Sequence, residues 1–312
     1  MVRKFFLNNM VVFSIVILLF YIGILIYSDV DKISDQIFNL KLHFLPIVFS
    51  LVVIHLIILG IKYHRILQKL QISIPLRESI QIFISGISLI ATPGGAGTAI
   101  KSQILKKKYD VPISKSIPII YMERLTELVA NILILLLFIY WGTLFESNYA
   151  IIIGGIFVFV LYLLISKNKV FASVKVILNK IKKIKKFSDS LDSSKESFEV
   201  LTKNKIFLEM TGWSLIAKIV QLFAIYFVFL SLDLNLGIIL SGQIYFTSLI
   251  LGTLSFLPSG IIITESTMIA ILNNNGIELS VATLFVIVVR LVTTWFATIL
   301  GIITLKITYK SK

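Results

Sequence analysis

Six long apolar runs constrain the fold of this chain more than any other feature. They cover residues 10–28, 44–61, 117–141, 149–166, 207–231 and 280–304. Each is close to the 17–25 residues that a helix needs to cross the hydrocarbon core of a bilayer. A β-barrel would show short segments of alternating polarity instead. Because 57% of the residues are hydrophobic and only 15% are charged, the runs predict an all-α, polytopic membrane bundle with about six full spans.

Two further apolar stretches, residues 79–105 and 238–272, are each interrupted by a proline–glycine motif. The motif residues are Pro93, Gly94, Gly95 and Gly97 in the first stretch and Pro258 and Gly260 in the second. Proline removes a backbone donor and glycine loosens a helix, so both motifs should break the helix. We expect each stretch to form a re-entrant pair of half-helices that enters and leaves on one side. The broken backbone must then be buried in protein or line a wet cavity.

The two broken stretches each begin a similar longer unit. An arginine follows the motif proline after 31 residues in the first unit (Arg124) and after 32 residues in the second (Arg290). A serine stands ten residues before each arginine. The repetition predicts an internal duplication inside one transmembrane domain of residues 1–312, with repeat units at about 79–141 and 238–304.

The formal net charge of +14 is distributed in a way that indicates topology. Hydrophilic blocks with a basic balance are Arg3-Lys4, 62–78, 101–115, 167–205 and 306–312, and the acidic blocks between them are 29–43, 142–149, 232–236 and 273–279. Basic loops mark the cytoplasmic side, so we expect a cell-membrane protein with both termini in the cytoplasm. The first re-entrant pair then enters from inside and the second from outside. Such inverted repeats recur in transporters that hold substrate near the midplane.

Residues 167–205 form the largest hydrophilic segment, with lysines between apolar residues at helical spacing. This pattern suits a basic amphipathic helix on an anionic cytoplasmic leaflet. A solvated helical linker that only fixes topology explains the pattern equally well. No base-reading motif accompanies the lysines, so nucleic acid is not an expected partner.

Arg124 and Arg290 are the strongest candidate functional residues. An arginine at the centre of a membrane helix costs about 2.5–3.5 kcal/mol on insertion scales, so it usually faces the bundle or a cavity. The planar guanidinium suits bidentate binding of phosphate oxygens, which makes both arginines candidate docking points for an anionic headgroup. The alternative is a structural role, in which each arginine binds carbonyl groups of the broken helices or a buried acid.

Other charged residues in apolar surroundings complete the candidate substrate-binding set. Three are acids, Glu123, Glu127 and Glu265, which could relay protons or simply compensate the arginines. Two are lysines, Lys101 just after the first motif and Lys218, which lies too deep in its run for easy snorkelling. Ser214 and Gln221 share the helix face of Lys218, so this face contributes to a polar cavity or serves packing alone.

The sequence offers little for catalysis or cofactor binding. It contains no cysteine, and its three histidines, His43, His55 and His64, lack metal-ligand spacing. Neither a nucleotide-binding loop nor a serine nucleophile elbow is present. We therefore expect a protein that is not an enzyme and holds no cofactor or metal.

The motifs in combination resemble those of a known family. They are Pro93-Gly94-Gly95-x-Gly97, Glu123-Arg124-Leu125, and Leu257-Pro258-Ser259-Gly260 through Glu265 followed by Val289-Arg290-Leu291. From about residue 10 to 305 the chain resembles the lysylphosphatidylglycerol synthase transmembrane region, the flippase-like UPF0104 membrane family. The resemblance implies a relative of the lipid-flipping half of bifunctional aminoacyl-phospholipid synthases of bacteria and archaea.

The chain also departs from the pattern of that family. The bifunctional proteins carry a soluble carboxy-terminal aminoacyltransferase domain, whereas this chain ends at Lys312, so lysine transfer to lipid is not expected. In addition, Ile261 and Ile262 follow the second motif where the family commonly has a further glycine pair. We therefore expect the outer break to be less open than the inner one.

Two functions fit these observations. The first is translocation of an anionic membrane lipid, such as a phospholipid or a polyprenyl-phosphate-linked sugar, through a cationic cavity between the repeats. The second is a non-transporting membrane subunit that scaffolds an envelope-synthesis enzyme, in which case the arginines serve assembly. A homo-oligomer is compatible with both functions.

Overall fold

The protein is described by a computed structural model that covers residues 19–26, 28–89, 96–141, 194–255 and 257–310. Within these ranges it is helical and contains no strand. The helical segments long and apolar enough to cross a bilayer are Leu42–Lys69, Asn204–Ser231, Gly237–Leu254 and Leu279–Thr308. The predicted all-α membrane class is confirmed. The predicted span at 149–166, most of the span at 10–28 and most of segment 167–205 lie outside the described residues.

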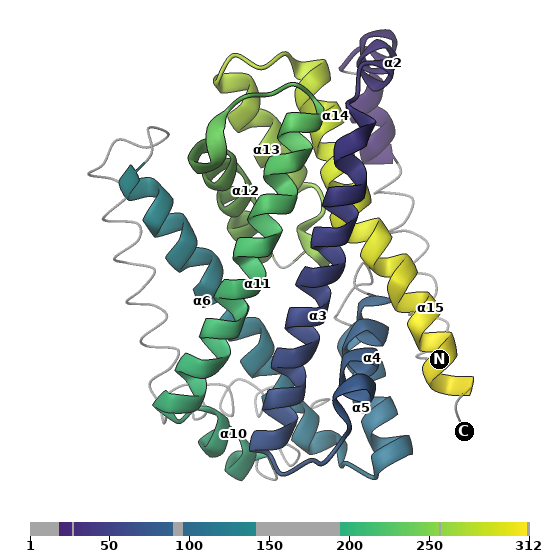
Figure 1. The fold of residues 1–312 in the computed structure, drawn as a ribbon, viewed down its shortest axis with the longest axis vertical. Coiled ribbons are helices and arrows are strands. Elements are labelled where there is room, and N and C mark those ends of the chain that lie inside the picture. Colours follow the sequence, from purple (N-terminus) through teal and green to yellow (C-terminus); the bar gives the residue numbers. More distant parts are fainter. Residues whose placement is uncertain (1–18, 27, 90–95, 142–193, 256, 311–312) are drawn as a thin grey trace, which may run out of the picture.

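The described helices follow one another in chain order, and residues 142–193, between α6 and α10, lie outside the description. Their bounds are α2 Val30–Phe38, α3 Leu45–Lys69, α4 Leu76–Ile87, α5 Ala96–Tyr109, α6 Ile113–Trp141, α10 Lys195–Leu201, α11 Asn204–Ser231, α12 Gly237–Leu254, α13 Ile263–Asn274, α14 Leu279–Arg290 and α15 Phe296–Lys310. A π-helical turn, Leu291–Trp295, joins α14 to α15, so the predicted span at 280–304 is one long helix with a local bulge directly after Arg290. Helices α3 and α11 lie side by side along the long axis of the molecule (Figure 1).

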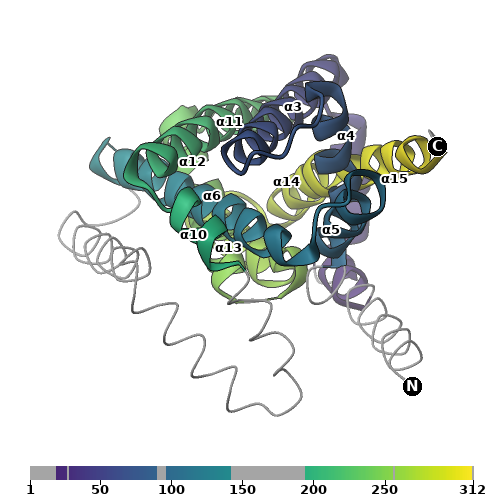
Figure 2. The ribbon, with the colours of Figure 1, turned by 90° about the horizontal axis from the view of Figure 1, so that it is seen from below.

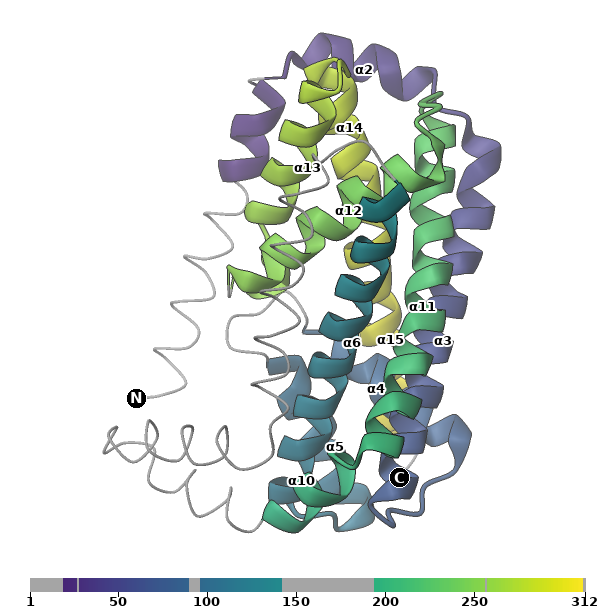
Figure 3. The same ribbon diagram turned by 90° about the vertical axis from the view of Figure 1, so that its left-hand side faces the viewer.

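The two broken stretches occupy opposite halves of the molecule. Helices α4 and α5 lie in the lower half of Figures 1 and 3, and α12 and α13 lie in the upper half. Helix α12 has 18 residues, which is long enough to cross a bilayer and longer than the half-helix expected from the sequence. It is strongly tilted, however, so that its end and the start of α13 lie near mid-height (Figure 3).

The second break forms where the sequence predicts it. Helix α12 ends at Leu254, a tight turn covers Pro258–Gly260, and α13 begins at Ile263. Gly260 has a φ of +63°, a conformation that glycine adopts without steric cost. Its Cα also lies close to Gly252 of α12, where a side chain on either residue would collide with the other backbone or with Thr264. Glycine is therefore required at this turn for two reasons.

The first break is placed differently from the prediction. Gly97 lies in the first turn of α5, which begins at Ala96, and so belongs to the helix rather than to the break. A glycine is tolerated there because the first turn of a helix has few intrahelical hydrogen bonds to weaken. Pro93, Gly94 and Gly95 lie outside the described residues.

The charged blocks separate to the two ends of the molecule. The basic blocks, as far as they are described, lie around the α3–α4 and α5–α6 connections, α10 and the end of α15, all at the lower end of Figure 1. The acidic blocks lie around α2, the α11–α12 connection and the α13–α14 connection at the upper end. This separation is what the alternation of charge along the sequence predicts.

Close helix contacts depend on glycine. A Cβ atom at Gly301 of α15 would lie 2.5 Å from the backbone nitrogen of Ser88, at the end of α4. On α12, a Cβ at Gly242 would collide with the ring of Phe138 on α6. Small residues at these positions let membrane helices approach closely, and here they hold the broken pairs against the long helices.

Candidate functional site

Among the described residues, a cavity of about 700 Å³ receives side chains from both predicted repeat units. Helices α3, α6, α11, α12 and α14 contribute to its wall, and in Figure 2 these helices surround the middle of the molecule. The polar and charged side chains that line it include His55, Lys101, Glu123, Arg124, Glu127, Asn131, Lys218, Gln221, Thr253, Arg290, Thr293 and Thr294. Arg124 and Arg290, which are distant in sequence, therefore line the same cavity.

Arg290 is held tightly by the second broken stretch. Its Nε donates to Glu265 Oε1 at 2.7 Å, and its Nη1 donates to the carbonyl oxygen of Ser259 at 3.3 Å. Tyr21 donates its hydroxyl to the same Glu265 oxygen at 3.0 Å. The side chains of Arg290 and Glu265 are only 8% and 0% exposed. Arg290 thus ties α14 to α13 and to the turn before it.

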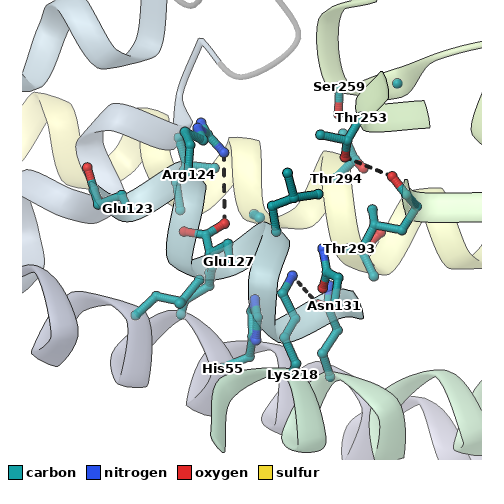
Figure 4. Close-up of a pocket in the computed structure, with 18 of the residues that line it drawn as sticks. His55, Glu123, Arg124, Glu127, Asn131, Lys218, Thr253, Ser259, Thr293 and Thr294 are labelled. Atoms are coloured by element: carbon teal, nitrogen blue, oxygen red, sulfur yellow. Dashed lines mark hydrogen bonds and ion pairs between the residues drawn. The ribbon is translucent and has the colours of Figure 1, made fainter. Parts of the chain in front are cut away.

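Arg124 has a different environment, although it occupies the corresponding position in the first repeat unit. Its side chain is 61% exposed, and its Nη1 lies 3.9 Å from Glu127 Oε2, beyond hydrogen-bonding distance. Figure 4 shows this contact across the cavity wall formed by α6. The two arginines are therefore not equivalent: one is sealed in a buried ion pair and the other is accessible.

Lys101 on α5 lies beside the cavity, but its charge is already compensated. Its Nζ is 2.7 Å from Glu123 Oε2 and lies above the rings of Tyr63 and Phe83, 5.1 and 5.3 Å from their centroids. Gly86 of α4 makes room for the lysine stem, because a Cβ there would lie 2.6 Å from Lys101 Cγ. This arrangement stabilises the contact between α5 and α6.

Lys62 on α3 is a charged residue of the site that the sequence analysis missed. It is completely buried, and its Nζ lies 3.2 Å from Glu127 Oε1 and 3.1 Å from Ser214 Oγ. It also donates to the Glu123 carbonyl oxygen and to Thr126 Oγ1, at 3.3 and 3.4 Å. The apolar run ends one residue before Lys62, which led to its assignment to a basic loop. Helix α3 instead continues to Lys69 and carries Lys62 into the interior.

Lys218 on α11 is the cavity lysine without an acidic partner. Its Nζ donates to Gln221 Oε1 at 2.9 Å, and within the described parts of the chain no carboxylate oxygen lies within 4.0 Å of it. Ser214, expected on the same face, contacts Lys62 and Thr126 instead. Asn131 Oδ1 is buried nearby in the cavity wall and has no hydrogen-bond partner among the described residues.

The charges that line the cavity do not balance. Four cations reach its wall, Lys101, Arg124, Lys218 and Arg290, but only two carboxylates do, those of Glu123 and Glu127. Glu265 pairs with Arg290 from behind the wall, and Glu123 pairs with Lys101. The excess positive charge therefore resides mainly on Arg124 and Lys218. Among the described residues no cluster of three or more histidine or acidic side chains could hold a metal ion.

Comparisons with known proteins agree with this membrane architecture. The model of the family described as "Lysylphosphatidylglycerol synthase TM region" matches residues 11–301. The chain belongs to this family. As the membrane region of the synthases, the family places the chain among integral membrane proteins.

Similar proteins of this family occur in archaea. The UPF0104 membrane protein MJ1595 of Methanocaldococcus jannaschii is 25% identical, over 97% of this chain and 96% of its own length. UPF0104 membrane protein MJ1078 of the same organism is 29% identical over 68% of this chain and 89% of its own length. UPF0104 membrane protein PH1989 of Pyrococcus horikoshii is 25% identical over 96% and 95%. The names of these family members indicate no catalytic activity.

For this family member, the residues named from sequence alone fall into three groups. The group at the cavity wall contains Lys101, Glu123, Arg124, Glu127, Lys218, Gly260 and Arg290. Glu265 and Pro258 adjoin it through Arg290 and the turn at Ser259. Gly97 lies in α5, and Pro93, Gly94 and Gly95 fall outside the described residues. The missed residues are Lys62, directly beyond the apolar run of α3, and His55 and Asn131, single polar residues within the apolar runs of α3 and α6.

Proposed function

We propose that this protein translocates a lipid with an anionic phosphate headgroup, a phospholipid or a polyprenyl-phosphate-linked lipid, across the cell membrane. The observation that carries the proposal is the cavity between the repeat units, which has excess positive charge on Arg124 and Lys218. A cation without a close acidic partner is costly inside a membrane protein and usually marks a substrate pathway.

The size of the cavity favours a headgroup rather than a whole lipid. A volume of about 700 Å³ is within the usual range for small-molecule pockets. A phosphate with a glycerol or a sugar fits this volume, whereas two acyl chains in addition do not. The lipid tails would therefore stay in the bilayer while the headgroup passes through the cavity. Apolar side chains on the wall, among them Leu125, Leu128 and Leu249, are compatible with tails nearby.

The arrangement of the broken stretches supports a transport path. In this proposal α4–α5 and α12–α13 are re-entrant pairs of an inverted repeat, with the basic end of the molecule and both termini in the cytoplasm. Each pair would form a barrier between the cavity and its own side of the membrane. Small movements of either pair would open the cavity to one side of the membrane at a time.

Reconstitution into liposomes tests the proposal. The rate at which fluorescent phosphatidylglycerol crosses the bilayer is compared with that of fluorescent phosphatidylcholine, with protein-free liposomes as the baseline. We expect faster crossing of the anionic lipid. Arg124→Gln and Lys218→Gln should each slow it about tenfold or more, because a lost hydrogen bond to a charged group costs about 1.5–3 kcal/mol.

A matched control separates the cavity from general charge effects. Lys195 lies on α10 with a 68% exposed side chain, so Lys195→Gln removes one positive charge far from the cavity. This variant should transport at the wild-type rate. If neither lipid crosses faster than in protein-free liposomes, autonomous translocation is wrong. If Arg124→Gln also prevents co-purification of a partner enzyme, the scaffold function replaces the translocation proposal.

A further inference from the structure

We propose that Glu127 is an internal substitute for the anionic headgroup: through a long contact it partly compensates the charge of Arg124 when no headgroup is bound, and an entering phosphate ester takes its place. The inference rests on the proposed function only for the source of the phosphate, a lipid. The exchange itself follows from the way in which Glu127, Lys62 and Arg124 are held.

The two carboxylate oxygens of Glu127 have different partners. Oε1 lies 3.2 Å from the buried Nζ of Lys62, and Oε2 faces Nη1 of Arg124 at 3.9 Å. Glu127 is 18% exposed, whereas Lys62 is not exposed at all. One oxygen therefore faces the protein interior, and the other faces the accessible arginine at the cavity.

Lys62 fixes Glu127 in place. An ammonium group has three donors, and Lys62 has four acceptors within 3.4 Å, on Glu123, Thr126, Glu127 and Ser214. These acceptors belong to α6 and α11, so the lysine cannot leave without unpairing a buried charge. Removing one partner of a buried ion pair is strongly destabilising, because it leaves an uncompensated buried charge. Glu127 therefore cannot follow Arg124, and exchange requires the arginine to move.

Arg124 is able to move. Its side chain is 61% exposed, and its contact with Glu127 is too long for a hydrogen bond. A phosphate ester offers two oxygens that match the guanidinium fork, and such bidentate contacts are shorter and stronger than a long ion pair. An entering phosphate would therefore displace Glu127 as the anion that contacts Arg124.

Lys218 supplies the second contact for the phosphate. The side chains of Arg124 and Lys218 both line the same cavity (Figure 4). The ammonium of Lys218 makes one hydrogen bond, to Gln221, within the described residues, although it has three donors. Arg124 and Lys218 can thus hold one anion between them.

The other arginine cannot exchange its partner in this way. Arg290 and Glu265 are in contact at 2.7 Å and are almost completely shielded, and Ser259 and Thr294 hold the guanidinium from further directions. A headgroup would have to displace Glu265 from Nε or gain access to Nη2, which is buried and has no partner among the described residues. Only one of the two arginines therefore binds the anion. Arg124 forms the anion site, and Arg290 is a structural residue of the cavity wall.

Equilibrium binding tests the exchange without requiring transport. The purified full chain in a neutral detergent is titrated with short-chain phosphatidylglycerol, and the dissociation constant is measured by thermophoresis. Arg124→Gln should weaken binding about tenfold or more. Glu127→Gln should strengthen it severalfold, because the competing anion is gone. In the Arg124→Gln background, Glu127→Gln should have no strengthening effect, because there is no longer a guanidinium to compete for.

A second variant addresses folding. Glu127→Gln leaves Lys62 buried without its carboxylate, so the double variant Lys62→Met/Glu127→Gln, which removes both charges, is measured as well. It should also bind phosphatidylglycerol more tightly than wild type. Lys195→Gln, which removes an exposed charge on α10, should bind like wild type. Weaker or unchanged binding in both Glu127 variants overturns the inference, and so does an equal gain in the Arg124→Gln background.

Two further ligands separate the inference from the proposed function. Inorganic phosphate that binds as tightly as phosphatidylglycerol, with the same response to Glu127→Gln, supports the exchange but overturns a lipid as the source of the anion. Short-chain phosphatidylcholine should bind more weakly, since its phosphate already has a cationic partner. If phosphatidylcholine binds as tightly as phosphatidylglycerol to every variant, the exchange is contradicted.

Discussion

Arg290 Nε and Glu265 Oε1 lie 2.7 Å apart in a region that water barely reaches, since the two side chains are 8% and 0% exposed. This ion pair joins the long helical segment that begins at α14 to α13, directly beyond the turn that breaks the second apolar stretch. The pair thus fixes this part of the cavity wall, whereas Arg124, at the corresponding place in the first predicted repeat unit, is accessible.

The buried pair should matter for stability. Arg290→Gln leaves Glu265 without its guanidinium in a dry environment, which should cost about 3–5 kcal/mol. Thermal melting in detergent should show a clearly lower midpoint for Arg290→Gln. The double variant Arg290→Met/Glu265→Met removes both charges and should regain much of the loss. The exposed pair Lys32–Glu278 is the control, and Lys32→Gln should melt like wild type. An unchanged midpoint for Arg290→Gln would show that the pair is not formed.

Glycine contacts between helices give a second prediction. Gly301→Ala would place a methyl group 2.5 Å from the backbone of Ser88, so α15 and α4 must separate, and overpacking of this kind costs about 1–3 kcal/mol. The matched control is Gly212→Ala on α11, where a Cβ meets nothing within 4 Å. Alanine there should leave the melting midpoint unchanged or raise it, because alanine favours a helix over glycine. Equal effects of the two substitutions would contradict the α15–α4 contact.

The ends of α4 and α5 should respond to pH. Hydrogen bonds from Lys108 and Tyr109 hold the pKa of Glu78 below its usual value. Because the folded state binds the proton less readily than the unfolded state, Glu78 stabilises the fold above its unfolded pKa. This contribution is lost as the pH falls through the lowered, folded pKa. Wild type should therefore melt higher than Glu78→Gln at pH 7, and the difference should shrink toward about pH 3. A difference that grows on acidification would reverse the assigned sign.

Much of the fold follows from the sequence because the bilayer allows few alternatives. Apolar runs must be helical in lipid, and basic loops gather on one side, so the helical class and the two charged ends were predictable. The placement of Arg124 and Arg290 at one cavity follows from the cost of exposing arginine to lipid. The second break was predictable as well, because the proline and glycine at positions 258 and 260 disfavour a continuous helix, and in the structure Gly260 adopts a positive φ.

The partners of the charged residues could not be predicted from the sequence. The two repeat units carry their arginines at nearly equal spacing, which suggests equal roles, yet Arg290 is sealed and Arg124 is accessible. The difference depends on where α13 carries Glu265, a tertiary relationship without a local signal. Lys62 was missed for a similar reason. The apolar run ends before it, and only the continuation of α3 to Lys69 places it inside.

The most direct test of the central claim is a labelling experiment on single cysteines. The chain contains no cysteine, so Thr293→Cys introduces one thiol at the cavity wall, and Ile299→Cys on α15 is a control at a 55% exposed apolar position outside the cavity. In reconstituted protein, a membrane-impermeant anionic thiosulfonate should label Thr293→Cys, and phosphatidylglycerol should slow this labelling more than phosphatidylcholine does. Ile299→Cys should stay unlabelled in the lipid environment. Failure to label Thr293→Cys, or labelling at the same rate with either lipid, would contradict a water-accessible cavity that holds an anionic headgroup.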